Sequence, residues 1–150
     1  MPVDGRISSA DAFYPSVPPL NVELTSRCNL KCPYCASPTL SRPREEMSLA
    51  LVERIVDECR REGFSIHALH GVGEPTLRRD LERVLEILGD AWAGWTATNG
   101  TLLDPGRVAR LRQRGLRGLY VSLDTLDPDL YRRTRGGVLE KTIENVRAVA

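Results

Sequence analysis

Short strand-like segments alternate with longer helix-like segments through most of this 150-residue chain. Alternating or continuous apolar residues typical of strands occur at 20–25, 64–69, 95–98 and 119–123. Apolar residues at helical spacing occur at 47–63, 77–89, 104–115 and 139–150. Strands that alternate with helices in this way indicate βαβ units and a parallel sheet. We therefore predict an α/β fold: a partial (β/α) barrel with about four βα units.

The first 17 residues differ from the rest of the chain, because they are rich in Pro, Ser, Asp and Gly and show little periodicity. We interpret residues 1–17 as an N-terminal extension and residues 18–150 as one core domain. A complete eight-fold barrel needs about 250 residues. The core domain is therefore expected to be incomplete at its C-terminus, either as a fragment or as an unusually short gene product.

Composition excludes several classes of protein. The formal net charge of +1 gives no electrostatic argument for binding nucleic acid. The N-terminus lacks the apolar region of a signal peptide, and no apolar run approaches the length of a membrane span. We therefore expect a soluble cytoplasmic protein. In that reducing compartment, its four cysteines are better explained as metal ligands, catalytic thiols or core residues than as disulfides.

Three cysteines lie in the loop after the first predicted strand: Cys28, Cys32 and Cys35. Thiolates are soft ligands that select iron–sulfur clusters, zinc or copper(I). A four-iron cluster held by only three thiolates has one iron free to bind another molecule, which suits a catalytic cluster better than an electron carrier.

Zinc is the alternative metal for this loop. A zinc site needs a fourth ligand, and the candidates are Cys59, His67 and His70. Zinc ligands usually come as two pairs, and the sequence has only one C-x2-C pair. Cys59 falls on the apolar side of the first predicted helix, so we expect it to be a core residue.

Four segments together resemble the radical S-adenosylmethionine (SAM) superfamily. The cysteine spacing C-x3-C-x2-C, with an aromatic residue before the last cysteine, is similar to the superfamily signature. Residues 71–75 (GVGEP) resemble its GGEP motif, with Val72 at the usual first glycine, and residues 98–100 (TNG) resemble a common segment. Residues 122–124 (SLD), with the LDPDLYRRTRGG segment that follows, are similar to segments of molybdenum-cofactor and peptide-maturing members.

The resemblance implies a mechanism and a set of cofactors. The three cysteines would hold a 4Fe-4S cluster whose open iron chelates SAM. Reductive cleavage of SAM would then give methionine and a 5′-deoxyadenosyl radical, which abstracts hydrogen from the substrate. The implied partners are an electron donor, such as flavodoxin or ferredoxin, and a peptide or small-metabolite substrate, as in SPASM-like or molybdenum-cofactor-like members.

The resemblance also implies SAM contacts at the ends of the second and third strands. Gly73 and Glu74 would border the methionine part of SAM. Gly73 would let the backbone approach the ligand, and Glu74 would either set the turn or meet the ammonium group. Asn99 matches a residue of the TNG segment, although an asparagine there also suits a tight turn without any ligand.

Three further SAM contacts are implied around the cysteine loop and the fourth strand. Ser122 resembles a serine that hydrogen-bonds SAM. Arg135 resembles an arginine that pairs with the SAM carboxylate, a task that suits a guanidinium group. Tyr34 occupies the aromatic position near adenine, and its alternative role is that of a packing residue.

Two other functions remain open at this point. The chain could be a non-catalytic iron–sulfur or zinc-binding module. It could also be an inactive, truncated remnant of a radical SAM enzyme, because the later strands of that family normally hold adenine and ribose.

Overall fold

The computed structural model describes residues 20–150, and the expected extension at 1–17 lies outside the described residues. Its strands are β1 (Leu20–Val22), β2 (Ile66–Leu69), β3 (Trp92–Thr98) and β4 (Gly118–Val121). Its helices are α2 (Leu49–Glu62), α3 (Leu81–Leu88), α4 (Pro105–Gln113), α5 (Pro128–Arg135) and α6 (Leu139–Val149). Three short 3-10 turns complete it: η1 (Ser37–Thr39), η2 (Pro75–Leu77) and η3 (Gly89–Ala91).

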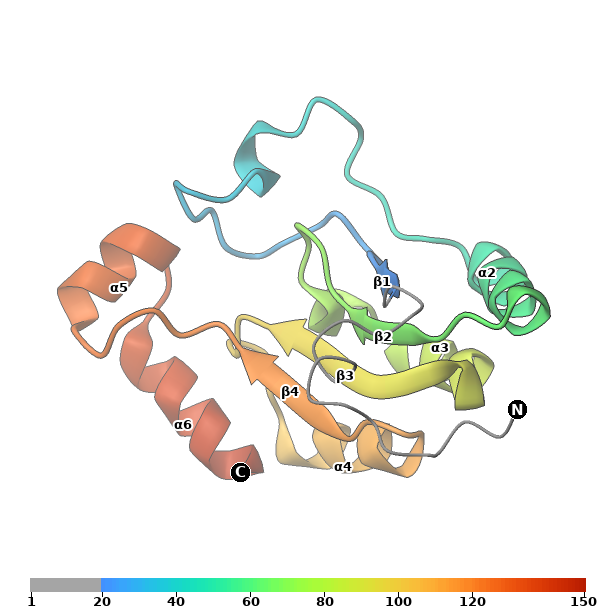
Figure 1. Ribbon diagram of the computed structural model, residues 1–150. Coiled ribbons are helices and arrows are strands. Elements are labelled where there is room, and N and C mark those ends of the chain that lie inside the picture. Colours follow the sequence, from blue (N-terminus) through green and yellow to red (C-terminus); the bar gives the residue numbers. More distant parts are fainter. Residues whose placement is uncertain (1–19) are drawn as a thin grey trace, which may run out of the picture.

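The strands of residues 20–150 form one parallel sheet in the order β1-β2-β3-β4 (Figure 1). Sheet order therefore follows chain order, and every strand pair is parallel, as the sequence predicts. Among the described residues the sheet is open, with β1 and β4 at its edges. This arrangement confirms the predicted α/β fold with four parallel strands and fits part of a (β/α) barrel.

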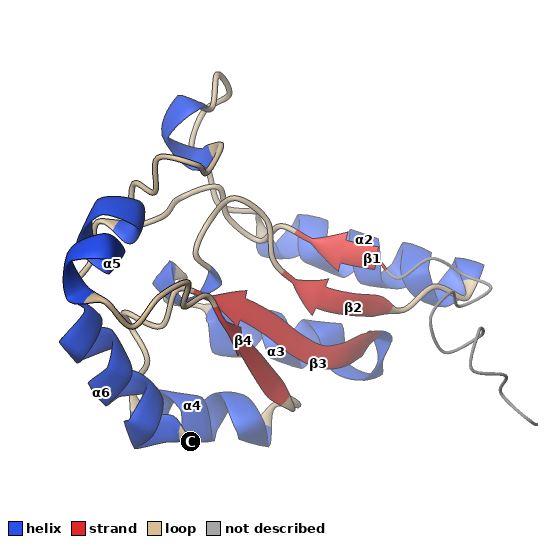
Figure 2. Cartoon of the chain, turned by 60° about the vertical axis from the view of Figure 1, so that its left-hand side comes forward, coloured by secondary structure: helices blue, strands red, loops and turns tan. Residues whose placement is uncertain are grey.

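The main helices cover one face of the sheet (Figure 2). The apolar core lies between that face and helices α2, α3 and α4. Each large apolar side chain buried there contributes about 1.5–3 kcal/mol. Cys59 of α2 is 3% exposed within this core, which confirms that it is a core residue. The loops that carry the sequence motifs follow the carboxyl ends of the four strands.

Helix ends agree well with the local sequence signals. Helix α2 begins after Ser48, whose hydroxyl accepts a hydrogen bond from the Leu51 N–H, and it ends at Gly63 with φ of 72°. Helix α4 begins at Pro105, and the carboxylate of Asp104 caps it. No helix in residues 20–150 is long and apolar enough to cross a membrane.

Several elements differ from the sequence prediction at their ends, and one is additional. Strand β3 begins at Trp92 rather than at 95. Within the predicted helical segment 77–89, helix α3 begins at Leu81, directly after Asp80, which the sequence offers as a possible N-cap. Asp80 does stand at the cap position, but its carboxylate binds Arg78 and makes no capping hydrogen bond. Helix α5 was not predicted, because its segment was noted only as part of the LDPDLYRRTRGG motif.

Candidate functional site

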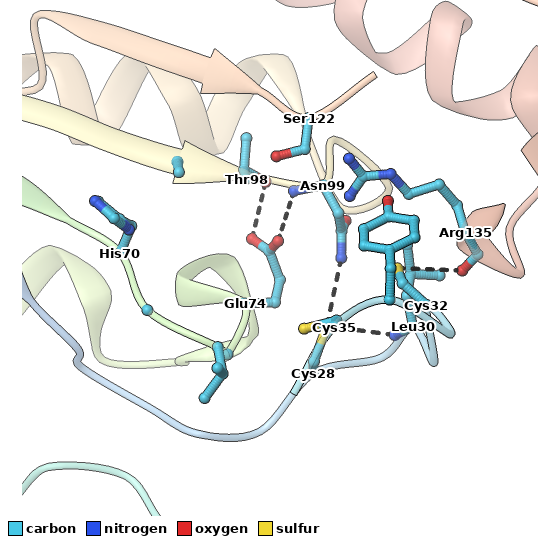
Figure 3. Close-up of a pocket in the computed structure, with 15 residues that line it drawn as sticks. Cys28, Leu30, Cys32, Cys35, His70, Glu74, Thr98, Asn99, Ser122 and Arg135 are labelled. Atoms are coloured by element: carbon cyan, nitrogen blue, oxygen red, sulfur yellow. Dashed lines mark hydrogen bonds between the residues drawn. The ribbon is translucent and has the colours of Figure 1, made fainter. Parts of the chain in front are cut away.

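The loops at the carboxyl ends of the strands surround one pocket of about 220 Å³ (Figure 3). Because all strands are parallel, these loops meet at one end of the sheet. The pocket is lined by Cys28, Leu30, Cys32, Tyr34, Cys35, His70, Gly71, Val72, Gly73, Glu74, Ala97, Thr98, Asn99, Ser122 and Arg135. All nine residues expected from the sequence lie in this lining, while their roles toward a ligand stay predictions.

The loop with the three cysteines is fixed at its beginning and by the segment that follows it. The Met47 N–H donates to the Leu24 carbonyl oxygen at 2.9 Å, and the Ser26 N–H donates to the Glu45 carbonyl oxygen at 3.0 Å. The hydroxyl of Ser26 also accepts from the Glu45 N–H at 2.9 Å. These bonds hold the chain before the first cysteine against the chain that leads into α2, so the loop projects from a fixed base.

Backbone and side-chain N–H groups already point at two of the sulfur atoms. The Cys28 Sγ accepts from the Leu30 N–H at 3.5 Å and from the Asn99 Nδ2 at 3.9 Å. The Cys35 Sγ accepts from the Ser37 N–H at 3.3 Å. Donors to sulfur stabilise thiolates and tune iron–sulfur clusters. The donor set and its surroundings therefore fit an iron–sulfur cluster.

Cys32 lies against the end of helix α5. Its Sγ donates to the Arg135 carbonyl oxygen at 3.7 Å. Burial raises the pKa of Cys28, partly offset by the Leu30 N–H, and the negative charge of Glu74 adds to the rise. Within residues 20–150, no three His, Cys, Asp or Glu side chains are already gathered as a metal site. Metal binding to these cysteines would require thiolates and would therefore release protons.

The candidates for a fourth zinc ligand do not join the cysteines. Cys59 lies in the core on α2, and His67 is exposed on β2. His70 lines the pocket, but Figure 3 places it on the other side of Glu74 from the three cysteines. The geometry therefore gives no support to a four-ligand zinc site.

Glu74 is buried, with 2% of its surface exposed, and its carboxylate is held by internal donors. Oε1 accepts from the Thr76 N–H at 3.1 Å, the Thr76 hydroxyl at 2.5 Å and the Thr98 hydroxyl at 2.8 Å. Oε2 accepts from the Asn99 N–H at 2.6 Å. Of the two roles expected for Glu74, this geometry favours setting the turn, and it joins the loops that follow β2 and β3.

Gly73 makes a close approach to the chain's own backbone. A Cβ on Gly73 would lie 1.9 Å from the Thr25 carbonyl oxygen and 2.9 Å from the Arg27 carbonyl oxygen. The next residue, Glu74, donates its N–H to the Arg27 carbonyl oxygen at 2.8 Å. The glycine is therefore needed for packing against the base of the cysteine loop, and a contact with a ligand stays a prediction.

Arg78 is a structural residue of the site that sequence reasoning missed. It is 2% exposed, and its Nη1 donates to the carbonyl oxygens of Leu24 at 3.0 Å and Met47 at 2.6 Å. Its Nε and Nη2 bind both carboxylate oxygens of Asp80, at 2.9 and 2.8 Å, and lower the pKa of that carboxyl. The neighbouring Arg79 is exposed, and no local sequence signal distinguishes the two arginines.

Asn99 connects its own turn to the cysteine loop. Its Oδ1 accepts from the Thr101 N–H at 3.0 Å, as expected for a tight turn. Its Nδ2 donates to Asn29 Oδ1 at 2.9 Å. Ser122 lies beside it, directly after β4, where its N–H donates to the Thr98 carbonyl oxygen at 2.8 Å. The backbone of both residues is therefore held in place beside the pocket.

Arg135 lies at the opposite side of the pocket from His70 and is bound by Asp124. Its Nε and Nη2 donate to the two oxygens of Asp124 at 2.7 and 2.6 Å. The Tyr34 hydroxyl donates to the same carboxylate at 2.5 Å, and the guanidinium lies 5.6 Å from the centre of the Tyr34 ring. The arginine, more than the tyrosine, holds the pKa of Asp124 below its usual value. Sequence reasoning quoted Asp124 within a motif but gave it no role.

Comparison with known sequences supports one family. The family model of the radical SAM superfamily matches residues 22–150. The probable GTP 3′,8-cyclase of Methanosarcina mazei is 36% identical over 146 residues, which cover 92% of this chain and 43% of that protein. The corresponding protein of Halobacterium salinarum is 37% identical, covering 92% of this chain and 40% of its own length. The chain thus spans about two fifths of the length of these curated relatives.

Comparison with solved structures supports the same fold. Streptococcus suis SuiB bound to S-adenosylmethionine has a TM-score of 0.70 at 23% identity, covering 87% of this chain and 30% of that one. BtrN in complex with AdoMet and 2-DOIA has a TM-score of 0.62 at 24% identity, covering 81% of this chain and 53% of that one. With the family match over residues 22–150, these comparisons confirm the resemblance seen in the sequence: the chain belongs to the radical SAM superfamily.

Proposed function

We propose that this chain is the cofactor-binding core of a radical SAM enzyme, with residues 18–150 as the core domain. Enzymes of this superfamily use a 4Fe-4S cluster and SAM. The observation that carries the proposal is that the three thiols share the lining of one pocket with Glu74, Ser122 and Arg135. Cys28, Cys32 and Cys35 are its proposed cluster ligands.

The pocket residues have distinct roles in this proposal. When bound, the reduced cluster supplies the electron that cleaves SAM into methionine and a 5′-deoxyadenosyl radical. The N–H groups of Leu30 and Ser37 stabilise charge on the thiolates. Arg135 offers a positive charge to the SAM carboxylate, and the Ser122 hydroxyl offers a hydrogen bond. Glu74 acts indirectly, because its carboxylate is occupied in fixing the turn.

The substrate is proposed to be a small metabolite. The relatives from archaea that match 92% of the chain are named as GTP 3′,8-cyclases, so GTP is the first substrate to test. A peptide is the second, since SuiB was crystallised with its precursor peptide SuiA. We further propose a flavodoxin or ferredoxin as electron donor and a cytoplasmic location, where the four free cysteines stay reduced.

The test is SAM cleavage by the full-length protein that contains this chain. After anaerobic cluster reconstitution, reductant and SAM should yield 5′-deoxyadenosine slowly even without substrate, and Cys35→Ala should abolish the product. An intact, reducible cluster in a protein that neither binds nor cleaves SAM would contradict the proposal. In that case the chain would be a non-catalytic iron–sulfur module or an inactive remnant, which shares the fold of radical SAM enzymes but not their function.

A further inference from the structure

We propose that Asp124 is a positioning residue of the SAM site, which holds Arg135 and the cysteine loop in the arrangement that SAM binding needs. This inference rests on the proposed function. Asp124 itself is absent from the pocket lining and therefore acts through its two partners.

Asp124 joins three parts of the chain that are distant in sequence. It follows β4, while Tyr34 belongs to the cysteine loop 90 positions away and Arg135 ends helix α5. All three of their hydrogen bonds meet on the one carboxylate. The Arg135 carbonyl oxygen adds a second link to the loop, because it accepts from the Cys32 Sγ. The carboxylate thus ties the last turn of α5 to the cysteine loop.

The geometry leaves part of the arginine free for a ligand. A guanidinium group has five N–H donors. Asp124 takes one on Nε and one on Nη2. The remaining donors, on Nη1 and Nη2, can still bind a second carboxylate as a fork. A two-bond contact fixes the plane of the guanidinium, and Figure 3 shows that group on the same side of the pocket as Ser122 and Asn99. Asp124 therefore orients the arginine without occupying all of it.

A matched control lies on the same helix. Asp129 and Arg132 of α5 also form an ion pair, at 3.0 Å, but their side chains are 73% and 69% exposed. In the Asp124 pair, by contrast, the Arg135 side chain is only 12% exposed. Asp129→Asn removes the same charge from the same region without touching the pocket, so it separates positioning from a general effect of charge.

The first experiment measures hydrogen exchange in the cluster-free protein. Asp124→Asn should accelerate exchange of the backbone amides in 28–39 and 132–136 by roughly five-fold, because a linked segment opens more often when its tie is weakened. Tyr34→Phe should accelerate only the first segment, and Asp129→Asn should accelerate neither pocket segment. Unchanged exchange in Asp124→Asn would overturn the proposed tie, whatever the enzyme binds.

The second experiment measures SAM affinity by calorimetry on the cluster-loaded full-length protein. Asp124→Asn should bind SAM about ten-fold more weakly at unchanged iron content, which corresponds to about 1.4 kcal/mol. Asp124→Glu should recover part of the affinity, and Asp129→Asn should match the wild type. Equal or tighter binding by Asp124→Asn would overturn the inference, since the carboxylate would then compete with SAM for Arg135. If the wild type binds no SAM, the proposed function fails, and the positioning role fails with it.

Discussion

Two carboxylates at the same end of the sheet work in opposite ways. Glu74 is 2% exposed and accepts four hydrogen bonds from uncharged hydroxyl and backbone N–H donors. The Asp124 side chain is 44% exposed and binds a charged partner, Arg135, together with a phenol. Glu74 joins the loops after β2 and β3, and Asp124 joins the loop after β4 to α5 and the cysteine loop.

The difference shows how one pocket combines a side held by buried hydrogen bonds with a side held by a partly exposed ion pair. Water and salt reach the Glu74 network poorly, so its bonds keep their strength and the loops stay in place. An ion pair with a half-exposed carboxylate is screened, and its loss costs little stability. We infer that the β2–β3 side is a rigid frame for the cysteine loop, and that the β4–α5 side positions Arg135 while contributing little to the stability of the fold.

The largest effect is expected from Glu74→Ala. This change leaves the Thr98 hydroxyl and the Asn99 N–H without their acceptor in a buried place, so the free energy of unfolding should fall by ~3 kcal/mol or more. Urea unfolding measures this change in free energy. Glu53→Ala is the control, because Glu53 lies on the exposed surface of α2. A loss below ~1 kcal/mol would mean that the β2–β3 side is not a rigid frame.

Arg78→Met extends the test to the base of the cysteine loop. It removes the donor to the Leu24 and Met47 carbonyl oxygens, so we expect a loss of about 2–4 kcal/mol in unfolding free energy. Arg79→Met is the matched control, because its side chain lies next in sequence and is exposed. Similar losses for the two variants would contradict the assigned role of Arg78.

Acid should weaken the Arg78–Asp80 pair in a defined direction. Arg78 lowers the pKa of Asp80 in the folded protein below its value in the unfolded chain. The pair therefore stabilises the fold fully above the unfolded pKa of about 3.9 and loses this contribution as the pH falls through the lower, folded value. The stability difference between wild type and Asp80→Asn should be largest near neutrality and shrink below about pH 4. A difference that grows in acid would contradict this assignment.

The smallest stability effect is expected from Asp124→Asn. Its unfolding free energy should fall by less than about 1 kcal/mol, and the difference should shrink as salt is raised to about 1 M. The loss in Glu74→Ala should be insensitive to the same salt. A large, salt-independent loss in Asp124→Asn would remove the contrast between the two sides of the pocket.

Local signals predicted the framework of this fold and could not predict its polar links. The alternation of segments predicted the parallel sheet, and the predicted helical range 104–115 matches α4, whose start at Asp104 and Pro105 depends only on neighbours in sequence. The choice between Arg78 and Arg79 depends on carbonyl oxygens 31 and 54 positions away. A periodic pattern carries no information about such contacts.

The candidate site, like the fold, could be predicted from the sequence only in part. Motif spacing placed the three cysteines and their six companions in one pocket, since parallel strands bring their carboxyl ends together. The internal donors that occupy Glu74, and the role of Asp124 between Tyr34 and Arg135, come from three-dimensional proximity alone. Helix α5 was missed as an element because its segment reads as polar, with a single buried side chain, Tyr131.

The central claim is that Cys28, Cys32 and Cys35 hold a four-iron cluster in this pocket. Its most direct test is the iron content per chain after anaerobic reconstitution, measured for the wild type and for single Cys→Ala variants. The wild type should contain about four irons, as expected for a cubane cluster. Replacing any one of the three loop cysteines should remove them, and Cys59→Ala should retain them, because Cys59 lies in the apolar core. One zinc per chain without iron uptake, or an undiminished cluster in all three loop variants, would contradict the claim.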